Sequence, residues 1–203
     1  MTVFDWLGLL TQWSRKLIEA EDFADGMPPP PEVLTSGWLG YPGASVEQIA
    51  QAEERLGTSL PPSYREFLQV TNGWRHLNSF IYRLWSTEEV EWFAVRNQEW
   101  IDIGLKIDAE PDPPGWIPEQ AILDEEYLVY DDQAYVSRWE YLQTALEISD
   151  TGDAVLLLNP QVITTEGEWE AWFFASWSEG RRYRSFWEMM QDEYQNFLDL
   201  IEN

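Results

Sequence analysis

Residues 46–73 read VEQIAQAEERLGTSLPPSYREFLQVTNG, and they carry the clearest local pattern in the chain. Ser45 and Gln48 form a capping box, in which each side chain satisfies an orphan backbone N–H at the start of a helix. Gly57 supplies a left-handed helix stop, and Pro62 suits the first turn of a second helix. Apolar residues recur at helical spacing in both halves. The stretch is therefore predicted to be a helical hairpin that ends at an Asn-Gly pair.

The second half of the chain predicts a sheet followed by a final helix. Four runs are rich in β-branched and aromatic residues and are bounded by turn residues. They are residues 127–130, 142–148, 154–158 and 169–177. Ser185 and Glu188 form a second capping box ahead of an amphipathic helix. This order predicts an α+β fold, in which the hairpin and the C-terminal helix pack on a mostly antiparallel, four- to six-stranded sheet.

Two further elements are expected between the hairpin and this sheet. A helix is predicted to start at Thr87, because Glu88 and Glu89 would then lie in its first turn, where the helix dipole favours anions. Trp100, Ile101 and Ile103 suggest a strand at residues 100–103.

The N-terminal part is predicted to be a separate arm. Residues 3–19 form an amphipathic pattern with apolar residues spaced by three and four. Pro28 to Pro31 follow, and four consecutive prolines favour an extended connector. We assign residues 1–31 to this helix and connector, and residues 32–203 to the main domain. The apolar stripe of the helix either packs on that domain or binds a partner.

The composition is strongly acidic. The 203 residues include 37 Asp and Glu against 12 Lys and Arg, which gives a net charge of −25, while 44% are hydrophobic, enough for a core. Such a chain repels phosphates and anionic lipid, so we expect no nucleic acid or membrane partner and favour a basic protein. Cysteine is absent, which excludes disulfides and thiolate chemistry. Neither a secretory signal nor a membrane span is expected, and we predict a cytoplasmic protein.

No group of residues in the sequence specifies a reaction. The one histidine, His76, has no second ligand at metal-binding spacing, and we expect it at the surface or at an interface. The glycines are scattered at turns and form no phosphate-binding loop. With 37 acids, accidental carboxylate pairs are common, so an acid–base hydrolase would need a deep cleft that holds two facing carboxylates. We expect no enzyme, no cofactor and no metal.

The acids are concentrated in the second half of the chain. Residues 101–203 hold 23 acidic and 5 basic residues, and no base lies between Lys106 and Arg138. A negative surface there would steer a cationic protein and raise its association rate. The alternative is a solvated loop face whose charge serves solubility. The partner-binding residues predicted from this segment are Asp108, Glu110, Asp112, Trp116, Glu119, Asp124, Glu125, Glu126, Asp131 and Asp132.

The hairpin and three later stretches together resemble the SMI1/KNR4 domain, also called the SUKH superfamily. The hairpin residues that match the family pattern are Ile49, Glu53, Leu56, Gly57, Leu60, Pro61, Tyr64, Phe67, Leu68, Asn72 and Gly73. The stretches DAVLLLNP at 153–160, EWEAWFFASW at 168–177 and RRYRSFWEMM at 181–190 are also similar to it. The resemblance covers residues 36–195 and leaves out the N-terminal arm and the acidic loop at 108–126.

The resemblance implies an α+β domain with helices on a sheet, and it implies no catalytic activity. Many bacterial members of the family are regarded as immunity proteins that bind and neutralise a toxin, often a nuclease. Fungal relatives act as interaction proteins in cell-wall synthesis and signalling. We therefore expect an immunity protein for a basic toxin or, as the alternative, a regulatory scaffold of the cell-wall or signalling type. The motif residues look like fold determinants, so they transfer no binding site.

Overall fold

The computed structural model describes residues 4–20, 29–78, 80–109, 127–130, 138–150, 154–175 and 178–202. Its centre is a five-stranded antiparallel sheet whose strands follow one another in chain order. The strands are β3 (Glu91–Trp92), β4 (Leu146–Glu147), β5 (Ala154–Ile163), β6 (Trp169–Ala175) and β7 (Ser178–Tyr183). This meander confirms the predicted α+β class and the antiparallel sheet.

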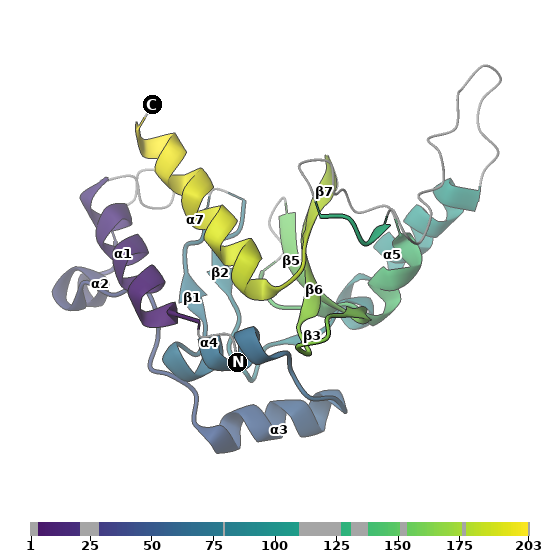
Figure 1. The fold of residues 1–203 in the computed structure, drawn as a ribbon, viewed down its shortest axis with the longest axis horizontal. Coiled ribbons are helices and arrows are strands. Elements are labelled where there is room, and N and C mark those ends of the chain that lie inside the picture. Colours follow the sequence, from purple (N-terminus) through teal and green to yellow (C-terminus); the bar gives the residue numbers. More distant parts are fainter. Residues whose placement is uncertain are drawn as a thin grey trace.

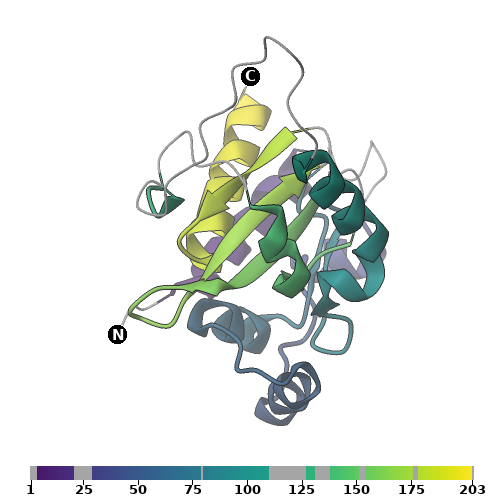
Figure 2. The ribbon, with the colours of Figure 1, turned by 90° about the vertical axis from the view of Figure 1, so that its right-hand side faces the viewer.

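Helices cover both faces of the sheet, and each face has its own core (Figure 1 and Figure 2). One side holds α1 (Trp6–Glu19), α4 (Pro62–Val70) and α7 (Phe186–Glu202), and the other holds α5 (Phe93–Ala109) and the 3-10 helix η1 (Trp139–Thr144). Side chains of a strand point alternately to its two faces. Leu156 of β5 accordingly enters the larger core, whereas Val155 and Leu157 enter the smaller one.

The predicted helical hairpin is confirmed as α3 (Val46–Leu56) followed by α4. Both bonds of the capping box form: Ser45 N–H donates to Gln48 Oε1 at 2.9 Å, and Gln48 N–H donates to Ser45 Oγ at 3.2 Å. Gly57 ends α3 with a left-handed φ of 71°. After α4, β1 (Trp74–Arg75) and β2 (Arg83–Leu84) form a small antiparallel sheet that the sequence pattern does not predict.

The apolar stripe of α1 is buried against the rest of the chain. Trp6, Leu10, Trp13 and Leu17 are each at most 1% exposed. The Trp6 indole N–H donates to the Ser63 carbonyl at 3.0 Å, and so ties α1 to the start of α4. A short helix, α2 (Pro31–Ser36), follows the proline-rich stretch. The stripe is therefore part of the larger core and is not an open surface for a partner.

Two expected elements are wrong. The helix expected from Thr87 begins at Phe93, because a turn and β3 come first. The strand expected at residues 100–103 belongs to α5, where Phe93 and Ile101 both enter the smaller core. A four-residue apolar run fits either period, and here packing against Phe174 of β6 favours the helix.

Candidate functional site

The predicted partner-binding segment lies outside the described side chains. Glu110, Asp112, Trp116, Glu119, Asp124, Glu125, Glu126, Asp131 and Asp132 fall outside the described residues, and of Asp108 the backbone alone is described, near the end of α5. Their role in docking therefore stays a prediction. The structure does describe residues 127–130, which lie between the two groups of acids in the sequence.

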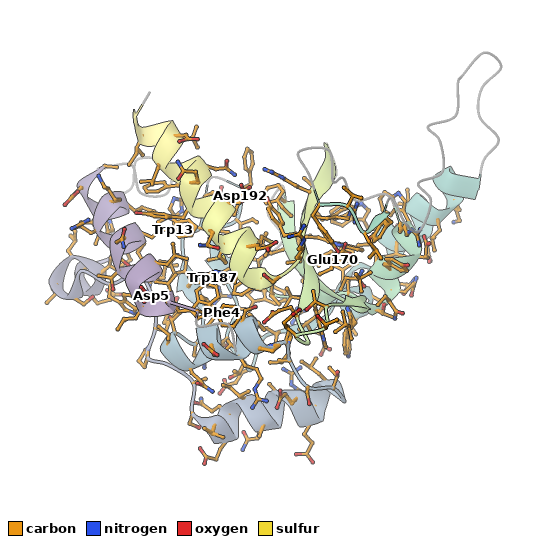
Figure 3. All side chains as sticks on the ribbon, in the orientation of Figure 1. Phe4, Asp5, Trp13, Glu170, Trp187 and Asp192 are labelled. Carbon is orange, nitrogen blue, oxygen red and sulfur yellow. The ribbon has the colours of Figure 1, made fainter. Side chains whose placement is uncertain are left out.

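Residues 127–130 are held on the sheet by the buried carboxylate of Glu170, a residue of β6 that is 1% exposed (Figure 3). Within the described residues this carboxylate accepts five hydrogen bonds. The donors are Tyr127 Oη at 3.0 Å, Tyr130 Oη at 2.9 Å, Asn159 Nδ2 at 2.9 Å, Trp172 Nε1 at 2.7 Å and an Arg182 guanidinium nitrogen at 3.0 Å. The predicted strand at 127–130 is absent from the described sheet, and these contacts hold the segment instead.

The Arg182 guanidinium completes this buried network. It pairs with Glu170 at 3.0 Å, lies 3.8 Å above the centre of the Tyr127 ring, and donates to the Tyr127 carbonyl. Burial, and then the negative charge of Glu170, raise the pKa of Tyr127 and Tyr130, so both phenols stay protonated donors. Because the lone pairs of the carboxylate are occupied, the network serves to fix this segment and offers no free base to a substrate.

A surface groove where α4 and α7 begin brings acids together with aromatic side chains. Its volume is about 830 Å³. Phe4 and Trp187 line it, and their ring centres are 5.7 Å apart. Figure 3 labels both side chains. The described charged residues in its lining are Glu66, Glu166, Glu168, Glu188 and Arg184. We call this lined space the acidic groove. Four carboxylates against one guanidinium leave it negative at neutral pH.

The acids of the groove differ in their freedom to meet a partner. Glu168 is 6% exposed and accepts hydrogen bonds from the backbone N–H and the hydroxyl of Ser63, so it holds the turn between β5 and β6 against α4. Burial raises its pKa. Glu66, Glu166 and Glu188 are exposed. These three carboxylates can therefore contact the cations of a partner.

The sequence of this chain also matches the model of a known protein family. The model of the SMI1 / KNR4 family (SUKH-1) matches residues 43–203. The chain belongs to this family. The match takes in α3, α4, the sheet and α7, whereas α1 and α2 precede it. A search of curated proteins finds no match.

None of the hairpin residues that match the SMI1/KNR4 pattern lines the acidic groove. The signature marks fold determinants: Tyr64 and Phe67 are buried, and they pack around Phe186 of α7. The exposed groove acids come from α4, the β5–β6 turn and α7, so they are far apart in the sequence. Sequence reasoning missed them because no spacing joins these segments before the chain folds.

Other kinds of site find no support in the part of the chain that the structure describes. No group of three His, Cys, Asp or Glu side chains there could hold a metal ion. No described helix is both long and apolar enough to cross a bilayer.

Proposed function

We propose that this SMI1/KNR4 protein is a non-catalytic immunity protein that neutralises a basic toxin domain by direct binding. Membership of the family over residues 43–203 carries the proposal, because the family is consistent with immunity and interaction modules. The toxin as partner is what the resemblance to bacterial members of the family implies, and its basic character is inferred from the charge of this chain; both go beyond family membership.

The charge of the chain specifies the partner's chemistry. A net charge of −25 attracts a cationic protein over long range and accelerates encounter. In the acidic groove, Glu66, Glu166 and Glu188 lie beside the rings of Phe4 and Trp187. Aromatic side chains next to carboxylates suit the arginine-rich surface with which a nuclease would contact phosphate. Covering that surface would block nucleic acid without any bond being made or broken.

Buried carboxylates in the described residues support binding over catalysis. Glu170 is saturated with donors, and Glu147 of β4 receives Asn97 Nδ2 at 3.3 Å and an Arg96 nitrogen at 3.5 Å. A hydrolytic pair would need two carboxyl groups that face a substrate across a cleft.

The test uses the toxin-domain protein encoded next to this chain. We expect a 1:1 complex by calorimetry, inhibition of the toxin, and an affinity that falls as salt is raised. A triple variant, Glu66→Gln, Glu166→Gln and Glu188→Gln, should weaken binding roughly tenfold or more, chiefly through the association rate.

The matched control removes the same charge elsewhere. Glu54, Glu99 and Asp199 are exposed and lie outside the groove lining, so their amide variants should bind nearly as well as the parent. A third set, Glu110, Asp112 and Glu119 changed to amides, tests the acidic segment predicted from the sequence. If the purified pair neither binds nor shows salt-sensitive inhibition, the proposal is wrong. If all three sets of variants lost the same amount of affinity, the effect would come from net charge alone, and the acidic groove would not be the binding site.

A further inference from the structure

A second cavity, of about 510 Å³, lies away from the acidic groove, between the C-terminal half of α7, the end of α1 and the loop that follows β1. Its walls are largely apolar, with Leu17 from α1, Phe173 from β6, and Phe197 and Leu200 from α7. Figure 1 shows α1 and α7 side by side at this end of the molecule. The volume and the apolar lining are those of a pocket that takes a small organic ligand. We call it the apolar cavity.

One carboxylate in the lining of this cavity forms no ion pair within the described residues, because the guanidinium of Arg181, which also lines the cavity, pairs with Asp192 instead. Glu193 of α7 is 8% exposed and lines the apolar cavity. Asn78 Nδ2 donates to its Oε2 at 2.7 Å. Within the described residues this is its one hydrogen bond, and no arginine, lysine or histidine forms an ion pair with it. A buried carboxylate that lacks a counter-charge is costly, so the site favours a ligand that supplies one.

The neighbouring charged groups are engaged with each other. Arg181 of β7 pairs with Asp192 at 2.9 Å, and the Tyr183 hydroxyl donates to the same carboxylate at 2.8 Å. His76, in the loop after β1, also lines the cavity. It is 8% exposed, so of its two expected positions, at the surface or at an interface, the surface is wrong. From α1 the lining residues are apolar, Leu17 and Ala20.

We propose that the apolar cavity binds a small organic cation, an apolar body carrying one primary ammonium group, with the ammonium on Glu193. An ammonium donates strong charge-assisted hydrogen bonds to a carboxylate. The phenyl rings of Phe173 and Phe197 offer apolar contact to the body of the ligand and cation–π contact to its ammonium group. The site lies apart from the acidic groove, and the inference does not rest on the proposed toxin.

Binding should respond to pH in a defined direction. Burial, with a smaller effect from the charge of Asp192, raises the pKa of Glu193 to about 7, although the Asn78 hydrogen bond and Arg181 act to lower it. The carboxylate is therefore mostly ionised above pH 7 and protonated below it. An ammonium ligand gains affinity as the pH rises through 7.

The experiment titrates the full chain with 2-phenylethylammonium chloride by calorimetry at about pH 8. The uncharged analogue 2-phenylethanol serves as the comparison. We expect the ammonium to bind at least about tenfold more tightly than the alcohol. Binding should weaken roughly tenfold or more at about pH 5.5. Glu193→Gln should remove the preference for the ammonium, whereas Asp199→Asn, an exposed change on the same helix, should keep it.

Folding of the variant is checked by its thermal transition, and Gln can still accept the Asn78 hydrogen bond. Any pH dependence that persists in Glu193→Gln arises from other groups, and the part that is lost from the parent curve measures Glu193. Equal affinity for ammonium and alcohol, or an unchanged preference in folded Glu193→Gln, overturns the proposal. Absence of binding by either probe at about 10 mM overturns it as well, since that limit corresponds to less than about 3 kcal/mol.

Discussion

Glu170 on strand β6 and Glu193 on helix α7 are both buried carboxylates, yet their surroundings are opposite. Within the described residues, Glu170 accepts hydrogen bonds from an arginine, two phenols, an amide and an indole, whereas Glu193 accepts one, from an amide. Burial without compensation raises the pKa of Glu193 to about 7. The hydrogen bonds and the ion pair with Arg182 offset the cost of burying the Glu170 carboxylate, which therefore has a structural role. Burial alone thus does not distinguish a structural carboxylate from one that binds a ligand. The hydrogen-bond partners of its oxygens make this distinction.

The Glu170–Arg182 pair should be essential for stability. Arg182→Met leaves an unpaired carboxylate in a site that is almost fully buried, so we expect a loss of about 3–5 kcal/mol in the free energy of unfolding, measured in urea. Arg181, the preceding residue, forms a half-exposed pair with Asp192, and Arg181→Met should cost at most about 1 kcal/mol. Similar losses in both variants would contradict the distinction.

Glu193 predicts a pH-dependent stability of the opposite sign to that of an ordinary ion-paired acid. Its pKa is raised from 4.5 to about 7 on folding, so the folded state holds the proton more tightly, and stability is lost as the pH rises from about 4.5 through 7. Glu193→Gln removes this loss. We expect the variant to gain up to roughly 3 kcal/mol over the parent between pH 5 and pH 8, measured from urea midpoints. Parallel pH profiles for parent and variant would refute it.

At the level of elements, α1 is integral to the packing although it precedes the family match. The Trp13 ring packs against Trp74, Tyr194 and Phe197, and so joins α1 to the small sheet and to α7. The alternative function, a scaffold that binds through this helix, depends on an apolar stripe that is buried here. Deleting residues 1–31 would therefore remove core and could not separate the two functions.

A point substitution tests the role of α1 more cleanly. Trp13 is fully buried, so Trp13→Ala should cost about 3–5 kcal/mol in the free energy of unfolding. Leu7, on the same helix, is 64% exposed, and Leu7→Ala should change stability by no more than about 0.5 kcal/mol. Both are measured by urea unfolding followed through tryptophan fluorescence. A small loss for Trp13→Ala would show that the helix is peripheral after all.

Sequence patterns predicted those elements whose signals are local. The capping box at Ser45 and the Gly57 stop are complete within a few residues, and both form as expected. The strand predicted at residues 100–103 is wrong because four residues do not show which side is buried. Ile101 shares a buried core with Phe93 of the same element and with strand β6, and this packing is not visible in the short run. The acidic groove could not be predicted for the same reason, since its walls come together only when α4, α7 and the β5–β6 turn pack.

For the whole molecule, most of the few cations are engaged in internal contacts. In the part of the chain that the structure describes, seven arginines pair with carboxylates: Arg55, Arg65, Arg75, Arg83, Arg96, Arg181 and Arg182. With 12 basic residues in all, few cations are left to offset the other acids. The composition therefore predicted a negative surface and a basic partner, while it could not say where on the fold that partner docks.

This surplus of acids predicts opposite salt responses for folding and for binding. Raising the ionic strength from 0.01 M to 0.15 M shortens the screening length from about 30 Å to about 8 Å, which relieves repulsion among surface carboxylates. The urea midpoint should rise, while the affinity for a basic toxin domain should fall. The variant Glu66→Gln, Glu166→Gln and Glu188→Gln should show a smaller rise. A fall in stability with salt would contradict this prediction, because it would show that ion pairs outweigh the repulsion among carboxylates. A loss of affinity at high salt would then reflect unfolding and not screening of the interface.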